Sequence, residues 1–151
     1  MDKAWKKQTI MIDKTDQALG EITRMHAAIE AWVRGISLRE DFEPEISSHL
    51  APEFRIVEPN GQIVTRDQAM TGLFRFHGGN PEFRITIDGA EIVMASEDFV
   101  LTTYVESQTG ARLASDTNVR RATCLFSVTD RVRHLYLHET WIEGNYVRGP
   151  N

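Results

Sequence analysis

The sequence predicts a single α+β domain, in which about three helices from the first half of the chain accompany a mainly antiparallel sheet. Helical periodicity ends near residue 76, and alternating strand patterns fill the chain beyond Pro81. The repeated strand–helix–strand order of a parallel α/β domain does not occur in the sequence. At 151 residues the chain has the common size of one domain with its own core, so we expect one domain over residues 1–151.

Three helices are expected. The first runs from Asp16 to Val33, where apolar residues recur at three- and four-residue spacing and Gly35 can end the helix. A shorter one is predicted around Glu43–Leu50, and a third over Arg66–Phe76 before a glycine pair. All four lysines lie within residues 1–14, which we interpret as a peripheral extension or an extra helical turn.

Strand patterns begin at Phe54. The runs Phe54–Glu58 and Gln62–Thr65 flank Asn60-Gly61, a dipeptide favoured in tight hairpin turns, and are therefore predicted to pair. The later runs alternate apolar and polar residues and are predicted strands at residues 83–88, continuing or resuming at 92–94, and at 99–106, 118–128 and 132–142.

The last run alternates so regularly that its two faces separate. One face carries Leu135, Leu137, Glu139 and Trp141, and the other carries His134, Tyr136, His138 and Thr140. If residues 129–131 form the turn, the preceding strand adds Ala122, Cys124 and Phe126 to the first face, which is then the inner one. The second face is too apolar for a purely solvated surface. We interpret it as a homodimer interface formed by His134, Tyr136 and His138.

Glu139 is the strongest candidate for a site residue. A carboxylate between leucines and a tryptophan on an inward face is costly unless a neighbour pairs or uses it. His26 falls on the buried stripe of the first helix, either as a hydrogen-bonded core histidine or as an acid–base group. Glu58 is a weaker candidate on the inner parity of its strand, near a rim.

The lining of a cavity can also be predicted. By apolar content, Phe99, Leu101, Thr103 and Val105 form the core face of their strand, which leaves Tyr104 and Glu106 outward unless a bulge reverses the order. The side chains predicted to line a pocket for a flat apolar ligand, or else simply to fill the core, are Trp32, Phe54, Thr103, Phe126, Leu137 and Trp141.

Composition excludes several classes of protein. No apolar run approaches the ~18 residues of a membrane span, and a net charge of −5 disfavours nucleic-acid binding. The polar start from Met1 to Gln8 does not resemble a secretion signal, so we expect a cytoplasmic protein. Cys124 is the only cysteine and is interpreted as a core residue. The histidines lack zinc-site spacing and the glycines lack the spacing of a phosphate loop, so we expect neither metal nor cofactor.

Four segments give the chain a resemblance to the nuclear transport factor 2-like superfamily. They are the helix from His26 to Trp32, the hairpin Val57–Gly61, Tyr104-Val-Glu106 and His138-Glu-Thr-Trp141. The resemblance covers about Asp16 to Gly144 and is closest to small stand-alone domains near the polyketide-cyclase-like, ketosteroid-isomerase-like and calmodulin-dependent kinase association domains. It implies a cone whose bent sheet wraps around the helices, a pocket open at one end, and dimers formed through the outer face of the sheet.

Together these observations lead to two hypotheses about function. The first is a domain that binds a small apolar or aromatic molecule in a half-polar pocket. If it is catalytic, it carries out cofactor-free isomerisation, dehydration or cyclisation with Glu139 and His26 as acid–base groups. The alternative is a non-catalytic oligomerisation or accessory module with a vestigial pocket.

Overall fold

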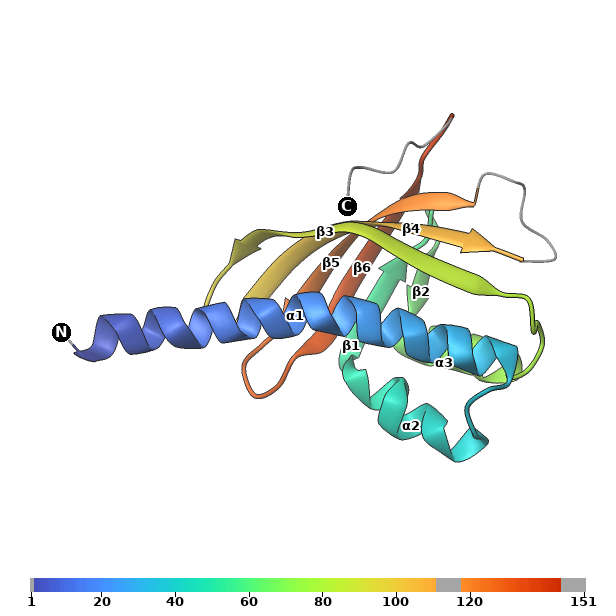
Figure 1. Ribbon diagram of the computed structural model, residues 1–151, viewed down its shortest axis with the longest axis horizontal. Coiled ribbons are helices and arrows are strands. Elements are labelled where there is room, and N and C mark those ends of the chain that lie inside the picture. Colours follow the sequence, from blue (N-terminus) through green and yellow to red (C-terminus); the bar gives the residue numbers. More distant parts are fainter. Residues whose placement is uncertain (1, 111–117, 145–151) are drawn as a thin grey trace.

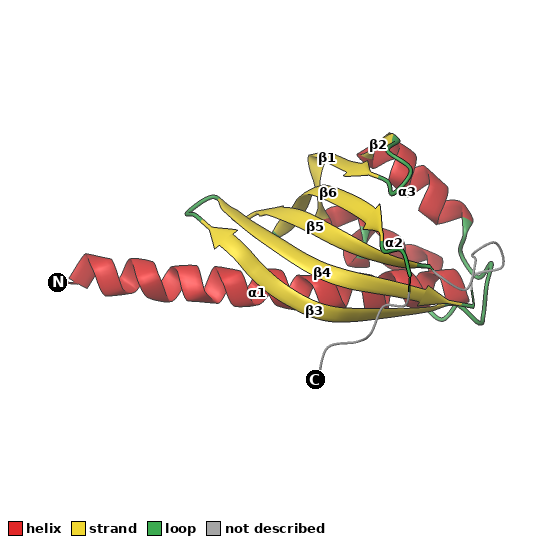
Figure 2. Cartoon of the chain, turned by 90° about the horizontal axis from the view of Figure 1, so that it is seen from above, coloured by secondary structure: helices red, strands yellow, loops and turns green. Residues whose placement is uncertain are grey.

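One curved sheet and the helices on its concave side make up the fold (Figures 1 and 2). The computed structural model describes residues 2–110 and 118–144. The helices are α1 (Asp2–Arg34), α2 (Phe42–Glu45) and α3 (Arg66–Arg75), with short 3-10 turns at Arg39–Asp41 and Ser47–His49. The strands are β1 (Leu50–Val57), β2 (Ile63–Thr65), β3 (Arg84–Ala95), β4 (Phe99–Thr109), β5 (Val119–Ser127) and β6 (Arg133–Trp141).

The sheet has six strands in the order β2-β1-β6-β5-β4-β3. Only β1 and β6 pair in parallel, and every other neighbouring pair is antiparallel. The predicted α+β class with a mainly antiparallel sheet is therefore confirmed. The predicted interruption after Asp88 is a local break in the pairing of β3 with β4 around Gly89, which has a positive φ of 60°, and the strand continues through it.

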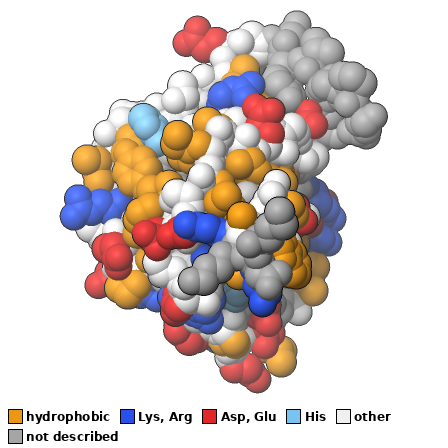
Figure 3. Space-filling model, turned by 90° about the vertical axis from the view of Figure 1, so that its left-hand side faces the viewer, with side chains coloured by type: hydrophobic (Ala, Val, Ile, Leu, Met, Phe, Trp, Pro, Cys, Tyr) orange, Lys and Arg blue, Asp and Glu red, His pale blue; other side chains and the backbone are white. Residues whose placement is uncertain are grey.

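Helix α1 is longer than the sequence predicts, because it includes the lysine-bearing start. Its N-terminal part projects beyond the sheet, where residues 4–10 are exposed (Figures 1 and 2). Seen from that end, apolar side chains lie among charged ones (Figure 3). Lys7 pairs with Glu97 and Lys14 Nζ donates to the Glu97 carbonyl at 3.0 Å, so this part of the helix is tied to the β3–β4 turn.

The segment from α2 into β1 differs from the prediction for an identifiable reason. The helix expected up to Leu50 ends at Glu45 and is followed by a 3-10 turn, and Leu50 already belongs to β1. Pro52 therefore lies inside β1, within the stretch where the pairing with β6 is interrupted between Leu50 and Arg55. A proline has no N–H to donate, which explains why the ladder skips it.

The core has two parts. One lies between the middle of α1 and the strands β4 and β5, and it contains Ile22, Val100, Tyr104, Cys124 and Phe126. The other lies where the end of α1 meets α2, β1 and β3, and it contains Trp32, Phe42, Ile46 and Phe54. Within the described ranges, no helix combines the length and apolar character needed to cross a membrane.

One predicted strand face is wrong, and so is the predicted position of one residue on another strand. In β4 the inner face carries Val100, Thr102, Tyr104 and Glu106. The outer face of this strand is apolar as well, and Val105 is also buried, so apolar content alone could not separate the two faces. In β6, His134 is buried rather than outward because the pairing with β5 shifts between Leu125 and Phe126, and Leu135 becomes the extra residue of a bulge.

Candidate functional site

A large open cavity of about 1730 Å³ lies on the concave side of the sheet. Part of the lining is apolar and comes from α1, β1, α3 and β3, with Met25, Ile29, Phe54, Met70, Leu73 and Ile85. A second part, the polar wall, comes mainly from β4, β5 and β6, with Tyr104, Glu106, Arg120 and Glu139, to which α1 adds His26. An apolar space with a few converging polar groups is the usual form of a small-molecule site.

The polar wall follows from the strand register. Tyr104 pairs with Ala122 and Ala122 with Glu139, while Glu106 pairs with Arg120 and Arg120 with Trp141. Paired residues on one face of a sheet are direct neighbours. The two adjacent rows therefore bring two carboxylates and a guanidinium together from the three consecutive strands β4, β5 and β6.

A continuous chain of hydrogen bonds connects the polar side chains. Glu106 Oε2 lies 3.2 Å from His26 Nε2, and Glu106 Oε1 accepts from Gln108 Nε2 at 2.6 Å. Asn118 Nδ2 donates to Gln108 Oε1 at 3.0 Å and accepts through Oδ1 from Arg120 Nη2 at 2.6 Å. Arg120 Nη1 then donates to Glu139 Oε2 at 3.2 Å. The chain runs from His26 to Glu139 without a break. The charges of these two residues also affect each other's pKa.

His26 and Glu106 form a buried ion pair. The Nδ1 of His26 lies 2.7 Å from the Ile22 carbonyl, which can only accept, so Nδ1 carries a proton. Burial alone lowers the pKa of His26, but the hydrogen bond and charge of Glu106 outweigh it and raise the pKa. Burial likewise raises the pKa of Glu106, yet His26, with help from Arg120 and Gln108, lowers it to about 2. Near neutral pH, Glu106 is therefore ionised.

Glu139 differs from its neighbour. Burial and the negative charge of Glu106 raise the pKa of Glu139 to about 7, against the opposing effect of Arg120. A carboxyl group with this pKa exchanges its proton close to neutral pH, which is the property of a general acid or base. Glu139 is therefore the group in the cavity best suited to proton transfer.

Tyr104 completes the polar wall. It is almost fully buried, and its ring makes an edge contact with that of His26 at a centroid distance of 5.4 Å. Burial, followed by the nearby Cys124 and carboxylates, raises the pKa of Tyr104 well above its usual value. The phenol therefore keeps its proton at neutral pH.

Comparison with solved structures identifies the fold. An NTF-2 like protein of unknown function from Pseudomonas aeruginosa aligns with a TM-score of 0.74 at 26% identity, covering 82% of this chain and 96% of that one. The chain adopts the nuclear transport factor 2-like fold. An NTF2-like protein from Novosphingobium aromaticivorans aligns with a TM-score of 0.71 at 11% identity, over 96% and 94% of the two chains. No protein-family model and no curated protein matches the sequence.

Another neighbour has a more specific name. It is a candidate dehydratase of the NTF2-like family from Streptomyces avermitilis, with a TM-score of 0.66 at 18% identity over 87% of this chain and 98% of that one. At that identity the likeness concerns the fold, because one fold carries many activities.

The cavity contains all three predicted acid–base candidates. His26 and Glu139 stand at the two ends of the hydrogen-bonded chain. Glu58 lines the cavity as a half-buried residue outside that chain. Sequence reasoning missed Glu106 and Tyr104 because the face of β4 was assigned wrongly, and it missed Arg120 although this residue shares the predicted inner parity of β5 with Ala122. The Tyr104-Val-Glu106 segment on which the resemblance rests was the signal that could have identified two of them.

The predicted lining residues fall into three groups. Phe54, Leu137 and Trp141 line the cavity. Trp32 and Phe126 are fully buried core residues, and Trp32 Nε1 donates to the Leu73 carbonyl at 2.9 Å. Thr103 lies on the outer face of β4, where its hydroxyl donates to the Ala122 carbonyl at 2.9 Å, so its predicted role in the pocket is wrong.

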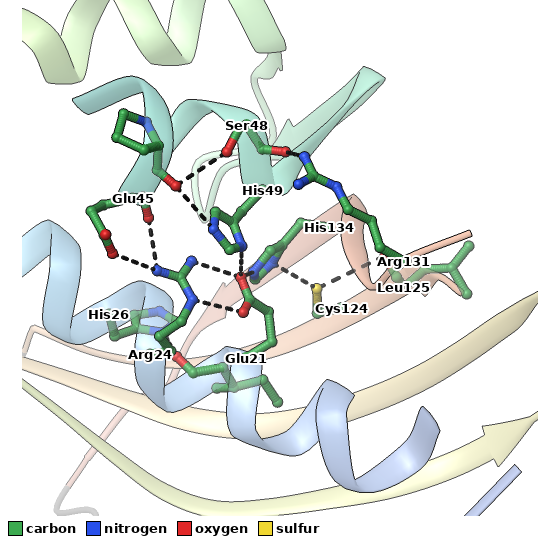
Figure 4. A network of polar contacts seen from close by, with 12 residues as sticks. Glu21, Arg24, His26, Glu45, Ser48, His49, Cys124, Leu125, Arg131 and His134 are labelled. Carbon is green, nitrogen blue, oxygen red and sulfur yellow. Dashed lines mark hydrogen bonds and ion pairs between the residues drawn. The ribbon is translucent and has the colours of Figure 1, made fainter. Parts of the chain in front are cut away.

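His134 belongs to a second buried network around Glu21, shown in Figure 4. Arg24 holds the Glu21 carboxylate with two hydrogen bonds of 2.8 Å, through Nε and Nη2. His49 Nδ1 lies 3.0 Å from Glu21 Oε1, while the 3.5 Å separation of His134 Nε2 from the same oxygen is too long for a good hydrogen bond. On its other side His134 Nδ1 lies 3.5 Å from Cys124 Sγ. With His134 enclosed in this network, its predicted interface role is wrong, and the roles of Tyr136 and His138 stay predictions.

The negative charge of Glu21 is compensated by the side chains around it. Burial raises the pKa of Glu21, but its contacts with Arg24 and His134 lower it to about 2. Burial lowers the pKa of His134 more than Glu21 raises it, so this imidazole is neutral. Across the described ranges, no group of three or more His, Cys, Asp or Glu side chains is arranged to hold a metal ion.

Proposed function

We propose that the cavity binds a small, largely apolar molecule and that Glu139 transfers a proton to or from it without a cofactor. The observation that carries the proposal is the position of a carboxyl group with a pKa of about 7 on the polar wall of a cavity whose remaining lining is largely apolar. Isomerisation, dehydration and cyclisation are the reaction types that need only such a group and an oriented substrate.

The surroundings of Glu139 support an acid–base role. Arg120 lies beside it, with 3.2 Å between Arg120 Nη1 and Glu139 Oε2, and can stabilise negative charge that develops on a bound carbonyl oxygen. Removal of a proton next to a carbonyl needs such a base and such a cation side by side. His26 acts at one remove, because it keeps Glu106 ionised and Glu106 raises the pKa of Glu139.

The fold neighbours agree with this type of chemistry. Solved structures with this fold include the candidate dehydratase described above and a candidate ketosteroid isomerase from Shewanella frigidimarina, which aligns with a TM-score of 0.58 at 17% identity. We propose the cytoplasm as the setting, which stays a prediction from the sequence.

The proposal is tested by ligand binding and hydrogen exchange. A thermal-shift screen of hydrophobic metabolites rich in cyclic and aryl ketones should find compounds that raise the melting temperature. For those compounds, NMR in deuterated water should show the protein accelerating deuterium incorporation next to the carbonyl. Glu139→Gln should slow that exchange by about 100-fold or more, because it removes the proton acceptor and keeps the shape.

Glu91→Gln is the matched control. It makes the same substitution on the outer side of the sheet, away from the cavity, where Glu91 pairs with Thr103. It should bind and exchange like the wild type. If no compound shifts the wild-type melting temperature, the binding proposal is wrong. If Glu139→Gln exchanges as fast as the wild type, the proton-transfer proposal is wrong.

A second candidate function, association, is favoured by the outer face of the sheet. One row across four strands, formed by Met94, Leu101, Leu125 and Tyr136, is apolar, and Met94 and Tyr136 are 64% and 38% exposed. We propose that a second copy of the chain packs there, with His138 in the next row. Sedimentation velocity should give a dimer for the wild type and a monomer for Tyr136→Glu. A monomeric wild type would contradict this proposal.

A further inference from the structure

We propose that Arg120 binds the carboxylate of the ligand, so that the cavity takes small apolar molecules ending in a carboxylate, and that they bind with Glu139 in its protonated form. The inference rests on the proposed function and names the class of molecule that the same cavity accepts. The position, the hydrogen-bonding capacity and the charge balance of Arg120 carry it.

Arg120 is held firmly on the cavity wall. Its guanidinium carbon lies 4.8 Å from the centre of the Trp141 ring, and its side chain is only 14% exposed. Asn118 accepts from Nη2 at 2.6 Å and Glu139 from Nη1 at 3.2 Å. A guanidinium fixed by an aromatic ring and two acceptors is preorganised to receive a planar anion.

The guanidinium has hydrogen bonds to spare. It carries five N–H donors, and side chains of the described residues accept from Nη1 and Nη2 only. The Nε–H finds no acceptor within residues 2–110 and 118–144, but it is buried away from the cavity, so the donors that a ligand can reach are the remaining N–H groups of Nη1 and Nη2. A carboxylate, which offers several lone pairs in one plane, is the group that best fits donors arranged in this way.

The charge balance of the wall depends on one proton. His26 and Arg120 are positive and Glu106 is negative, so the wall has one positive charge in excess when Glu139 is protonated and none when Glu139 is ionised. An ionised Glu139 also forms an ion pair with Arg120 itself. A ligand carboxylate therefore competes with the Glu139 carboxylate for the same cation, and it binds best when Glu139 holds its proton.

The other titratable groups around the cavity do not reverse this balance. Tyr104 on β4 and His134 on β6 are neutral near pH 7. Glu58 at the end of β1 and Glu143 after β6 also line the cavity, but Glu58 is half-buried and Glu143 is exposed, so water screens their charge. The one positively charged patch of the cavity lining, within the described ranges, is thus at Arg120 and His26, and His26 is already paired.

The apolar wall fixes the rest of the ligand class. Met70, Leu73 and Ile85 line the cavity outside the polar wall and offer no charge to a second polar group. A molecule with an apolar body and one terminal carboxylate satisfies both walls at once. The cavity of about 1730 Å³ is large enough for a ring system or a branched chain beside the anchoring group.

The test uses ω-phenyl carboxylic acids from phenylacetate to 6-phenylhexanoate, each compared with its own primary amide by isothermal titration calorimetry. For at least one chain length, the acid should bind the wild type about tenfold or more tightly than the amide at pH 6.5. Above about pH 7 the affinity for the acid should fall about tenfold per pH unit, and binding should take up a proton from the buffer. The amide should show neither effect.

Two variants separate the parts of the inference. Arg120→Gln should weaken binding of the acid about tenfold or more and leave binding of the amide within about threefold of the wild type. Glu139→Gln imitates the protonated carboxyl group, so it should keep the preference for the acid and lose both the pH dependence and the proton uptake. Because Glu139→Gln retains binding, this variant also shows that the cavity is folded.

The outcomes distinguish this inference from the proposed function. Equal affinities for acid and amide, or an unchanged preference in Arg120→Gln, overturn the role of Arg120 and leave the binding of neutral ketones untouched. A preference for the acid that does not depend on pH overturns the part played by Glu139. If no acid or amide in the series binds the wild type, this inference is wrong, and a positive ketone screen would then show that the proposed function survives it.

Discussion

Glu21 and Glu139 are buried to the same extent, with 8% of each residue exposed, yet their carboxyl groups behave in opposite ways. The pKa of Glu21 is lowered to about 2, and that of Glu139 is raised to about 7. Burial raises the pKa of both, so burial cannot be the cause of the difference. The cause is the set of partners that each carboxylate meets.

Glu21 meets positive or hydrogen-bonding groups on several sides. Arg24 binds both of its oxygens, and His49 approaches one of them. Glu139 has one hydrogen bond from Arg120, a cation that also donates to Asn118, and it stands close enough to Glu106 to feel its negative charge. The comparison shows that a buried carboxylate is structural when its charge is fully compensated, and available for proton transfer when compensation is partial.

The largest effect is expected from breaking the compensated network. Glu21→Gln removes the negative charge that Arg24 and its neighbours were arranged to hold, and it leaves a partly buried cation without its partner. We expect the free energy of unfolding at pH 7 to fall by about 3 kcal/mol, at the lower end for buried pairs because Arg24 is about one-third exposed. Urea denaturation followed by circular dichroism measures it.

Glu45→Gln is the matched control for that experiment. Glu45 also approaches Arg24, with 3.6 Å between Glu45 Oε2 and Arg24 Nη1, but its side chain is 60% exposed. An exposed ion pair contributes little, so we expect a change below about 0.5 kcal/mol. Equal effects of the two substitutions would mean that the charge of Glu21 does not stabilise the fold.

A smaller effect on stability is expected at Glu139, and its dependence on pH is opposite to that of Glu21. Its folded pKa of about 7 lies above the ordinary value of 4.5, so its contribution to stability is complete below pH 4.5 and is lost as the pH rises through 7. For Glu21 the contribution is present above pH 4.5 and is lost as the pH falls through 2. The free energy of unfolding of the wild type should therefore fall by about 2 kcal/mol between about pH 5 and 8. In Glu139→Gln this fall should be absent.

Urea denaturation at a series of pH values measures this second effect. Glu106→Gln is a further test of the cause. Removing the neighbouring negative charge should lower the pKa of Glu139, so the fall in the free energy of unfolding should end at a lower pH. A wild-type stability that stays constant from pH 5 to 8, or that loses the same amount in Glu139→Gln, would show that Glu139 does not titrate near neutral pH.

The sequence was sufficient to find Glu139 because two strands agree on it. Ala122 and Cys124 pair with Glu139 and Leu137 as the predicted hairpin requires, and all four lie on the inner face. A period-two pattern on both strands of a hairpin determines which residues share a face, so one strand checks the other. Helical periodicity separately located His26 on the buried stripe of α1.

Sequence reasoning failed where both faces of a strand are apolar or where the register slips. Both faces of β4 contain buried residues, so its alternation could not identify the inner one and Glu106 was assigned outward. The bulge at Leu135 reverses the parity of β6 for His134 alone. A bulge depends on how two strands meet, and no local pattern in the sequence announces it.

The sequence by itself determined the fold class, the order and approximate bounds of the elements, and the inward position of Glu139, because helical and strand periodicity are local properties of the chain. A spacing of three residues on α1 places Arg24 beside Glu21. Only the tertiary structure decided that Glu139 lies beside Glu106 and Arg120, and that His49 and His134 approach Glu21. Those neighbours come from different elements, and it is their charge, at distances of a few ångströms, that makes one buried acid structural and the other a proton donor or acceptor.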